Sequence, residues 1–293
     1  MLELPVTARQ VQVEECAINY LVWNEDETTL PPLVLLHGRM SHAFCWAPVV
    51  PLLNRHPCVA IDFSGMGDSG WREAYSYQDR MSEVCAVVEE CGFEKPILVS
   101  HSFGAVIACR LVEQDALRWA GLVACDPSIE HPDLWPQQVP RAEPVALERP
   151  HKIRQGPREL VDRFRFAPPQ VSCEPAIEEY IAWQGVRQVE GGFSWKFDPR
   201  VYSQYEEGHD DWWVGHSQMF CNLWSPKVLI YGGVSEFLNR ETVKGIESQA
   251  IHLLKSIEIP HAAHHIMADQ PVALAVAIGQ AVELICEAST LED

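Results

Sequence analysis

Short apolar runs alternate with longer amphipathic stretches over most of the chain. Such runs, when no polar residue interrupts them, are typical of parallel strands whose two faces are both covered by helices. The runs that predict buried strands are residues 33–36, 58–62, 97–100, 122–125, 228–231 and 256–259. The stretches that predict helices are residues 46–54, 77–91, 103–115, 240–250 and 271–288.

Two further segments near the N-terminus alternate with period two. Val11 and Val13, and then Ile18, Tyr20 and Val22, occupy every second position on either side of a polar break. This alternation predicts a pair of half-exposed antiparallel strands. Together the elements predict an α/β fold with a mostly parallel, twisted sheet of about eight strands flanked by helices.

The alternation of strands and helices breaks once. No buried strand is recognisable between Pro127 and Gly215, where the composition shifts towards Pro, Arg and aromatic residues. A structureless connection of that length is improbable inside a compact domain. We therefore predict a mostly helical insertion, with helices near residues 158–166 and 176–188, that covers one end of the sheet. The predicted division is a core of residues 1–127 and 216–293 and a cap of residues 128–215.

The charge balance narrows the class of partner. The 293 residues include 41 Asp and Glu against 22 Lys and Arg, a formal charge of −19. Such a chain is repelled by a phosphate backbone and by an anionic membrane surface, so we expect neither nucleic acid nor a membrane as partner. The clearest apolar runs also fall short of the roughly 20 residues that a spanning helix needs. Residues 1–10 contain no basic stretch followed by an apolar run, which a secretory signal would have. The expected location is therefore cytoplasmic.

The cysteines favour the same compartment. Ten of them are scattered from Cys16 to Cys286 without a Cys-x-x-Cys pair. A disulfide framework belongs to short secreted chains, so we predict buried, reduced thiols without a catalytic role.

The strongest chemical signal lies at residues 97–105, Ile-Leu-Val-Ser-His-Ser-Phe-Gly-Ala. An apolar strand runs directly into a small-x-Ser-x-small pentapeptide and then into a helix. A serine at such a sharp strand-to-helix turn is pushed into the cleft, and the small residues Ser100 and Gly104 permit the turn. Ser102 is therefore the candidate nucleophile. The alternative is a serine-rich turn that only joins strand and helix.

A second signal follows the first buried strand, at residues 35–40, Leu-Leu-His-Gly-Arg-Met. In an enzyme with a nucleophile elbow, this loop supplies one donor of the oxyanion hole, and the residue after the nucleophile supplies the other. The expected donors are the backbone N–H groups of Arg39 and Phe103. We expect Met40 to line the pocket and His37 to order the loop through hydrogen bonds.

With these motifs the chain resembles the α/β-hydrolase superfamily, in particular the capped bacterial serine hydrolases that act as esterases. Residues 62–69, Asp-Phe-Ser-Gly-Met-Gly-Asp-Ser, are similar to the Asp-x-x-Gly-x-Gly-x-Ser loop of that family. The resemblance covers essentially the whole chain. It implies an α/β-hydrolase fold with an inserted helical lid, and it makes Asp62 a structural residue rather than a catalytic acid.

The base is expected after the last buried strand, because the family order is nucleophile, acid, histidine. Three histidines compete there, His261, His264 and His265. Alignment of Asp269 and Pro271 with the family's Asp-x-Pro places the catalytic histidine at His264. His265 is the alternative if the loop is shifted by one residue, and His261 is the weakest candidate. A zinc site would need a matching Cys or carboxylate cluster, which is not evident, so no metal and no cofactor is expected.

Two carboxylates are candidates for the acid that pairs with the histidine. The loop at residues 232–238 occupies the place where related hydrolases carry Asp, and its carboxylate is Glu236. Glutamate is one methylene longer, but Ser-His-Glu triads are allowed. Asp126, at the end of an earlier strand, is the alternative acid, because some members take it from that strand. We favour Glu236.

The resemblance implies hydrolysis of a carboxylic ester through an acyl-enzyme, with a small-molecule substrate that has an apolar part. Thioester, lactone and C–C bond hydrolysis remain open, as does a ligand sensor with slow turnover. The sequence does not indicate an oligomeric state. Residues expected to line the substrate pocket are Met40, His101, Trp183 and Phe237. Further cap aromatics that are candidates for the pocket are Phe164, Phe166, Tyr180, Trp195, Trp212 and Trp213.

One stretch of the predicted cap reverses the sign of the chain's charge. Its basic residues are Arg141, Arg149, Lys152, Arg154, Arg158, Arg163 and Arg165. The simpler interpretation is a solvated surface that balances acidic neighbours. The sharper hypothesis is that the stretch attracts anionic substrates, such as acyl-CoA or half-esters of dicarboxylic acids.

Overall fold

A central eight-stranded sheet organises the computed structural model, which describes residues 6–53, 56–129, 150–170, 172–202 and 215–290. The strand order is β1-β2-β4-β3-β5-β6-β9-β10. β1 and β2 are antiparallel, β2 is antiparallel to β4, and the remaining neighbours are parallel. The strands are β1 Thr7–Val13, β2 Cys16–Trp23, β3 Leu33–Leu36, β4 Cys58–Ile61, β5 Ile97–His101, β6 Gly121–Cys125, β9 Lys227–Gly232 and β10 Leu253–Ile259. The predicted α/β architecture is therefore confirmed.

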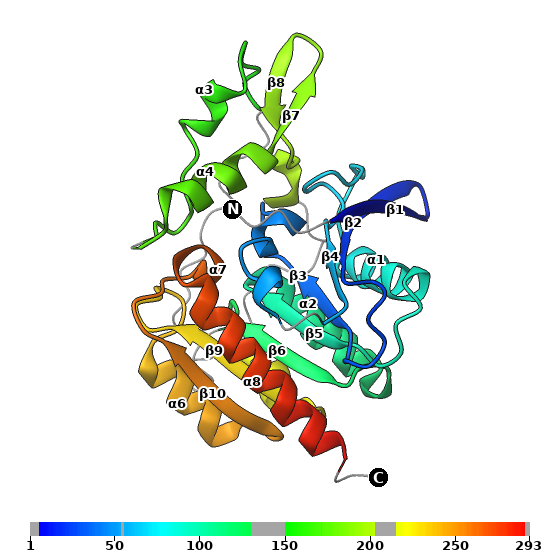
Figure 1. Ribbon diagram of the computed structural model, residues 1–293, viewed down its shortest axis with the longest axis vertical. Helices are drawn as coiled ribbons and strands as arrows, with labels where there is room; N and C mark the ends of the chain where they lie inside the picture. The colour runs from blue at the N-terminus through cyan, green and yellow to red at the C-terminus, as the bar shows by residue number, and fades with distance from the viewer. Residues whose placement is uncertain (1–5, 54–55, 130–149, 171, 203–214, 291–293) are drawn as a thin grey trace.

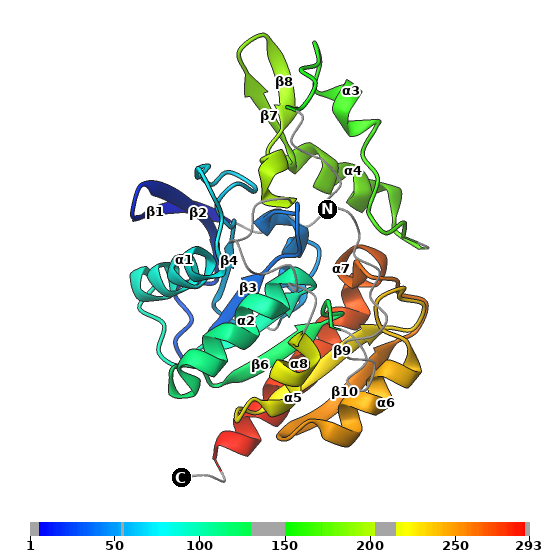
Figure 2. The same cartoon turned by 180° about the vertical axis from the view of Figure 1, so that it is seen from behind.

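Helices cover both faces of this sheet (Figures 1 and 2). One face packs against α1 Tyr77–Glu90, α2 Phe103–Gln114, α5 His216–Asn222 and α6 Arg240–Gln249. The opposite face packs against α8 Pro271–Ser289 and the short 3-10 helices η1 Ala43–Trp46 and η2 Val50–Leu52. Along β3, Val34 and Leu36 enter the first layer while Leu33 and Leu35 enter the second. Both faces are buried, which explains why the strand has no polar position.

The described part of the predicted cap, residues 150–170 and 172–202, is less helical than the sequence predicts. It contains α3 Arg158–Val161, α4 Pro175–Gln184, η5 Pro199–Tyr202 and an antiparallel hairpin of β7 Val186–Val189 and β8 Gly192–Trp195. The predicted helix over residues 176–188 is wrong beyond residue 184, and that over 158–166 is too long. Gly191 and Gly192 have φ values of 82° and 146°, a region that favours glycine and permits the tight hairpin turn. These elements lie beyond the carboxyl ends of the parallel strands (Figure 1).

α8 is an apolar helix that packs on the sheet. Among the described residues, it is the one helix that is long enough and apolar enough to cross a membrane. Leu274, Ile278, Ala281 and Ile285 are buried in the layer that also contains Val123 and Val228. This one-sided burial is that of a core helix in a globular domain.

All ten cysteines lie within the described residues, and all are free thiols. Cys58, Cys109 and Cys125 are buried, and burial raises the pKa of the Cys109 thiol to about 12. No two of the ten described cysteines form a disulfide, as predicted, but Cys85, Cys91, Cys173 and Cys286 are only partly buried.

The loop after β4 is built around Asp62, as its resemblance to a fold marker implies. Its buried carboxylate accepts hydrogen bonds from the Ala43 N–H at 2.6 Å, the Asn19 amide at 2.8 Å and the Asp68 N–H at 2.9 Å. A Cβ on Gly67 would lie 2.1 Å from this carboxylate, so only glycine fits there. Asp62 is thus a structural residue that joins β2, η1 and its own loop.

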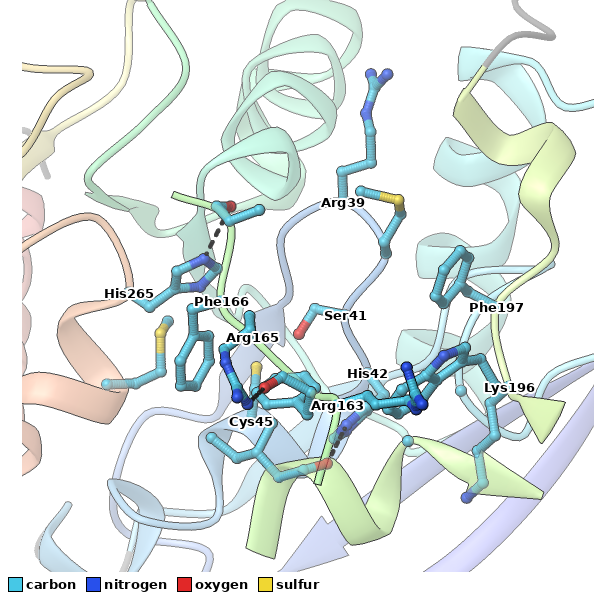
Figure 3. Close-up of a pocket in the computed structure, with 18 residues that line it drawn as sticks. Arg39, Ser41, His42, Cys45, Arg163, Arg165, Phe166, Lys196, Phe197 and His265 are labelled. Carbon is cyan, nitrogen blue, oxygen red and sulfur yellow. Dashed lines mark hydrogen bonds between the residues drawn. The ribbon is translucent and has the colours of Figure 1, made fainter. Parts of the chain in front are cut away.

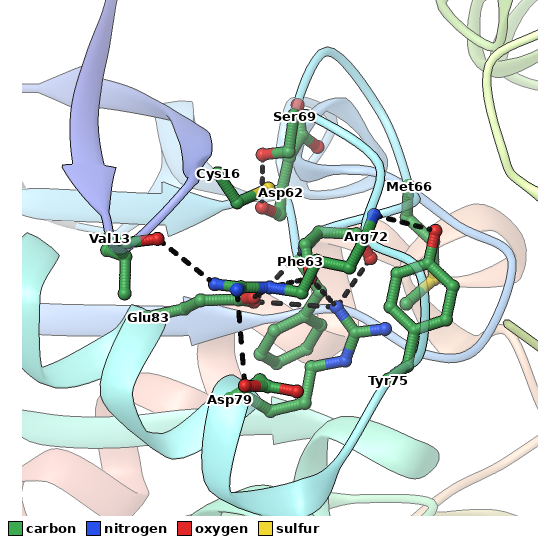
Figure 4. A network of polar contacts seen from close by, with 12 residues as sticks. Val13, Cys16, Asp62, Phe63, Met66, Ser69, Arg72, Tyr75, Asp79 and Glu83 are labelled. Atoms are coloured by element: carbon green, nitrogen blue, oxygen red, sulfur yellow. Dashed lines mark hydrogen bonds and ion pairs between the residues drawn. The ribbon is translucent and has the colours of Figure 1, made fainter. Parts of the chain in front are cut away.

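A buried ionic network fixes the start of α1 against the first hairpin (Figure 4). Glu83 accepts a hydrogen bond from the Arg72 guanidinium at 3.2 Å and from the Ser64 N–H at 3.0 Å, and it lies 3.4 Å from Arg80. The Glu83 and Arg80 side chains are fully buried. Arg72 also donates to the Val13 carbonyl at 3.3 Å. The carboxylate therefore holds two cations and a backbone amide that come from three segments.

Replacement of Glu83 with glutamine is expected to destabilise the fold by about 3 kcal/mol, because it leaves buried guanidinium groups without their counter-charge. Urea unfolding measured by circular dichroism tests this. The control is Glu89→Gln, whose side chain is 68% exposed and pairs with Arg118 at 2.8 Å. Exposed pairs contribute at most about 1 kcal/mol, so equal losses in the two variants would contradict the expectation.

Candidate active site

Ser102 occupies the sharp turn between β5 and α2. Its φ of 52° and ψ of −119° are a strained combination for a residue with a side chain. The turn is crowded: a Cβ on Gly104 would lie 2.6 Å from the Leu36 carbonyl oxygen, and one on Gly38 would lie 3.2 Å from the Ser102 Cβ. Glycine at positions 104 and 38 is therefore required by the packing. This is the geometry of a nucleophile elbow.

The hydrogen bonds of Ser102 lead to His264 and then to Asp126. The distance from Ser102 Oγ to His264 Nε2 is 2.9 Å, and that from His264 Nδ1 to Asp126 Oδ2 is 2.7 Å. A carboxylate only accepts, so Nδ1 carries the proton and donates it to Asp126, which leaves Nε2 to accept the Ser102 hydroxyl. All three side chains are buried. The structure thus brings a serine, a histidine and a carboxylate into the order of a catalytic triad.

The preference for Glu236 as the acid is wrong in this structure. Glu236 is exposed, whereas Asp126 is fully buried against His264. The loop after β9 supports Asp126 instead, because the Gly232 N–H donates to Oδ1 at 3.0 Å and the Ser235 hydroxyl donates to Oδ2 at 2.6 Å. β6 and β9 are parallel neighbours, so their carboxyl ends meet at the same place. The acid therefore comes from one strand and its hydrogen-bond donors come from the next.

Ser128 also belongs to the site, although no motif in the sequence marks it. Its hydroxyl lies 3.0 Å from Ser102 Oγ and is buried. Because the Ser102 proton points to His264, Ser128 is the donor in this contact. The available signal was its position two residues after Asp126, where a strand end meets the site edge.

His101 and Phe237 enclose the imidazole of His264. Their ring centroids lie 4.7 Å and 4.2 Å from that of His264. His101 Nε2 also donates to the His264 carbonyl at 2.9 Å. Burial, reinforced by His264 and His265, holds the pKa of His101 well below its usual value, so His101 is neutral. Both residues were predicted to line the pocket, but they pack on the base and are absent from the cavity lining described below.

His37 and Arg39 shape the loop that follows β3. His37 Nδ1 donates to the Gly38 carbonyl at 2.6 Å, and Nε2 accepts from the Phe63 N–H at 3.2 Å. Burial lowers the pKa of His37 to about 4, which keeps it neutral, and its predicted role in ordering the loop is confirmed. The Arg39 guanidinium lies 4.9 Å from the centroid of the Phe103 ring. The two expected oxyanion donors therefore belong to residues in contact.

The other two histidines of the last loop have separate surroundings. His265 lies against Phe166, with ring centroids 4.8 Å apart, and burial lowers its pKa to about 3. His261 is exposed, and its carbonyl accepts a hydrogen bond from Ser172. Within the described ranges, no three His, Cys, Asp or Glu side chains converge on a point that suits a metal ion.

A cavity of about 300 Å³ lies between the β3 loop and the cap segment (Figure 3). Met40 lines it, as predicted, but Trp183 is 40% exposed and does not. Tyr180 packs edge-on against Phe44 instead. Trp212 and Trp213 fall outside the described residues. The aromatic side chains that line the cavity are Phe164, Phe166, Trp195 and Phe197.

Comparison with known proteins finds similarity over most of the chain. Residues 33–277 match the model of the alpha/beta hydrolase family. The chain is 27% identical over 272 residues to the esterase Rv0045c of Mycobacterium tuberculosis, covering 90% of this chain and 85% of that one. A shorter match, 28% over 115 residues, links 38% of this chain to 37% of a haloalkane dehalogenase of Psychrobacter cryohalolentis.

Solved structures share the fold over nearly the whole chain. The thioesterase domain from the curacin biosynthetic pathway superposes with a TM-score of 0.74 at 19% identity, covering 94% of this chain and 99% of that chain. The crystal structure of the esterase Rv0045c gives a TM-score of 0.71 at 22% identity, with coverages of 95% and 92%. With the family model matched over most of its length, the chain belongs to the alpha/beta hydrolase family.

Proposed function

We propose that the protein is a serine hydrolase that cleaves a carboxylic ester of a small molecule through an acyl-enzyme. The observation that carries the proposal is the continuous hydrogen-bond chain from Ser102 through His264 to Asp126. A relative that matches 90% of this chain is named an esterase. Serine at the nucleophile position also separates this chain from family branches that use an aspartate nucleophile.

The first half of the reaction forms the acyl-enzyme. Ser102 Oγ attacks the substrate carbonyl carbon while its proton passes to His264 Nε2, and Asp126 stabilises the resulting imidazolium. The N–H groups of Arg39 and Phe103 hold the oxyanion. The ester C–O bond then breaks, and His264 returns the proton to the leaving alcohol.

The second half of the reaction releases the acid. Water attacks the acyl carbon and gives a proton to His264, which transfers it to Ser102 Oγ as the acyl–serine bond breaks. Ser128 donates a hydrogen bond to the same oxygen and so helps to hold it in line between attacks.

A fluorophosphonate probe combined with an ester panel tests the proposal. We expect stoichiometric labelling of Ser102, located by peptide mass spectrometry, together with turnover of short p-nitrophenyl esters. Thioesters and lactones of equal acyl length form the comparison arms, because a thioesterase shares the fold. Labelling without turnover of any substrate in the panel would favour a ligand sensor instead.

A further inference from the structure

The cavity beneath the cap is lined by cationic and apolar side chains. Its charged lining residues are Arg39, Arg163, Arg165 and Lys196, and within the described part of the chain none of its lining residues is Asp or Glu. The cavity lining is therefore positively charged, although the chain as a whole has a formal charge of −19. A cavity with one sign of charge and low-dielectric walls attracts ligands of the opposite charge.

Two of these cations are engaged elsewhere. Lys196 forms an ion pair with Asp68 at 2.6 Å, and Arg39 lies over the Phe103 ring. In Figure 3 both side chains extend away from the other lining side chains. The histidines of the lining are neutral, because burial lowers the pKa of His42 to about 4 and that of His265 to about 3. The positive charge available to a ligand therefore comes from Arg163 and Arg165.

Arg163 and Arg165 lack a carboxylate partner among the described residues. The Arg165 guanidinium donates only to main-chain oxygens, those of Asp162 and Phe164, which do not neutralise its charge. By contrast, Arg158, five residues before Arg163 in the same basic stretch, is paired with both Asp162 and Glu179. Arg158 is thus balanced by carboxylates, whereas the exposed Arg163 and Arg165 line the cavity without such a partner among the described residues.

The cavity lining includes His265, whose ring centroid lies 5.0 Å from that of His264. Two further lining residues, Arg39 and Met40, follow Gly38, where an added Cβ would lie 3.2 Å from the Ser102 Cβ. Phe164, Phe166 and Trp195 also line the cavity, and Phe166 packs against His265. At about 300 Å³ the volume is at the lower end of small-molecule pockets. It suits an acyl chain of modest length and is too small for the nucleotide part of acyl-CoA.

We propose that this cavity takes an acyl chain that ends in a carboxylate, so that the preferred substrates are half-esters of dicarboxylic acids. Arg163 and Arg165 bind the free carboxylate, the aromatic side chains contact the methylene groups, and the ester carbonyl reaches Ser102. The inference rests on the proposed ester hydrolysis and adds to it the chemical class of the acyl group.

The test compares charged and neutral esters of equal acyl length. Mono-p-nitrophenyl esters of succinate through suberate are paired with the p-nitrophenyl esters of the matching monocarboxylic acids, and kcat/KM is measured at low and high salt. We expect a preference for the half-ester at one or two chain lengths that weakens with salt. Equal kcat/KM values for the two series at every length would overturn the inference.

A double variant tests whether Arg163 and Arg165 bind the carboxylate. Arg163→Gln with Arg165→Gln is expected to lower the ratio of half-ester to neutral-ester kcat/KM by about tenfold or more, since hydrogen bonds to charged groups are lost. The matched control, Arg158→Gln, removes a paired arginine of the same stretch and is expected to leave the ratio unchanged. A double variant with an unchanged ratio would also overturn the inference.

Failure of the proposed hydrolysis is distinguishable from failure of this inference. If neither ester series is turned over, ester hydrolysis is contradicted, and calorimetry with the free dicarboxylates then decides on the cavity alone. Binding that is lost in the double variant and kept in Arg158→Gln supports the carboxylate site. Absence of binding to the unmodified protein contradicts it.

Discussion

The Ser102→Ala variant is expected to lose ester turnover by a factor of about 10⁴ or more, and to lose all labelling by a fluorophosphonate. The reason is that the hydroxyl held 2.9 Å from His264 Nε2 is the attacking group, and no acyl-enzyme forms without it. The measurement is kcat/KM with p-nitrophenyl acetate, together with the pre-steady-state release of p-nitrophenol.

A second serine of the same turn provides the control. Ser100 lies two residues earlier on β5, and its hydroxyl hydrogen-bonds to the Val123 carbonyl at 3.3 Å rather than to His264. Ser100→Ala is expected to retain turnover, with a loss of stability of about 1 kcal/mol. If Ser102→Ala kept the burst and the turnover of the unmodified protein, the acyl-enzyme mechanism would have to be abandoned.

The Asp126→Asn variant is expected to lower kcat by about 10³ to 10⁴. An amide at this position can donate a hydrogen bond to Nδ1, which favours the tautomer with its proton on Nε2. That tautomer no longer accepts the Ser102 proton. The measurement is kcat with the same ester, after circular dichroism has shown that the variant is folded.

Glu236→Gln is the matched comparison, because it makes the same chemical change in the competing carboxylate. Glu236 is exposed, so this variant is expected to retain turnover within about twofold, as surface changes usually do. The reverse pattern, with Glu236→Gln inactive and Asp126→Asn active, would restore the acid that the sequence favoured.

Much of the fold followed from local patterns. Strands such as residues 33–36 were recognisable because burial on both faces excludes polar residues from every position. α1 and α2 begin at the predicted residues, and α1 does so because Ser76 and Asp79 form a capping box. The hairpin of β7 and β8 was missed, since its strands are short and half-exposed and their pattern is weak.

The site residues also fall into two groups, those recognisable in local motifs and those that depend on contacts between distant segments. Ser102 and His264 were found because each lies in a motif read along the chain, a strand-to-helix turn and a loop before the last helix. Asp126 and Glu236 follow two different strands, and the choice between them depends on which side chain points to the imidazole. Ser128 had no motif of its own, and its role depends on a contact with a residue 26 positions away.

By itself, the sequence determined the order of the strands along the chain, the elbow at Ser102 and the histidine loop, because each depends on neighbours within a few residues. Only the tertiary structure decided that Asp126 faces His264, and that Arg163 and Arg165 line the cavity. The physical reason is that these facts depend on parallel pairing and packing between distant segments. β6 and β9 are parallel neighbours, so their carboxyl ends lie side by side although a long insertion separates the two strands along the chain.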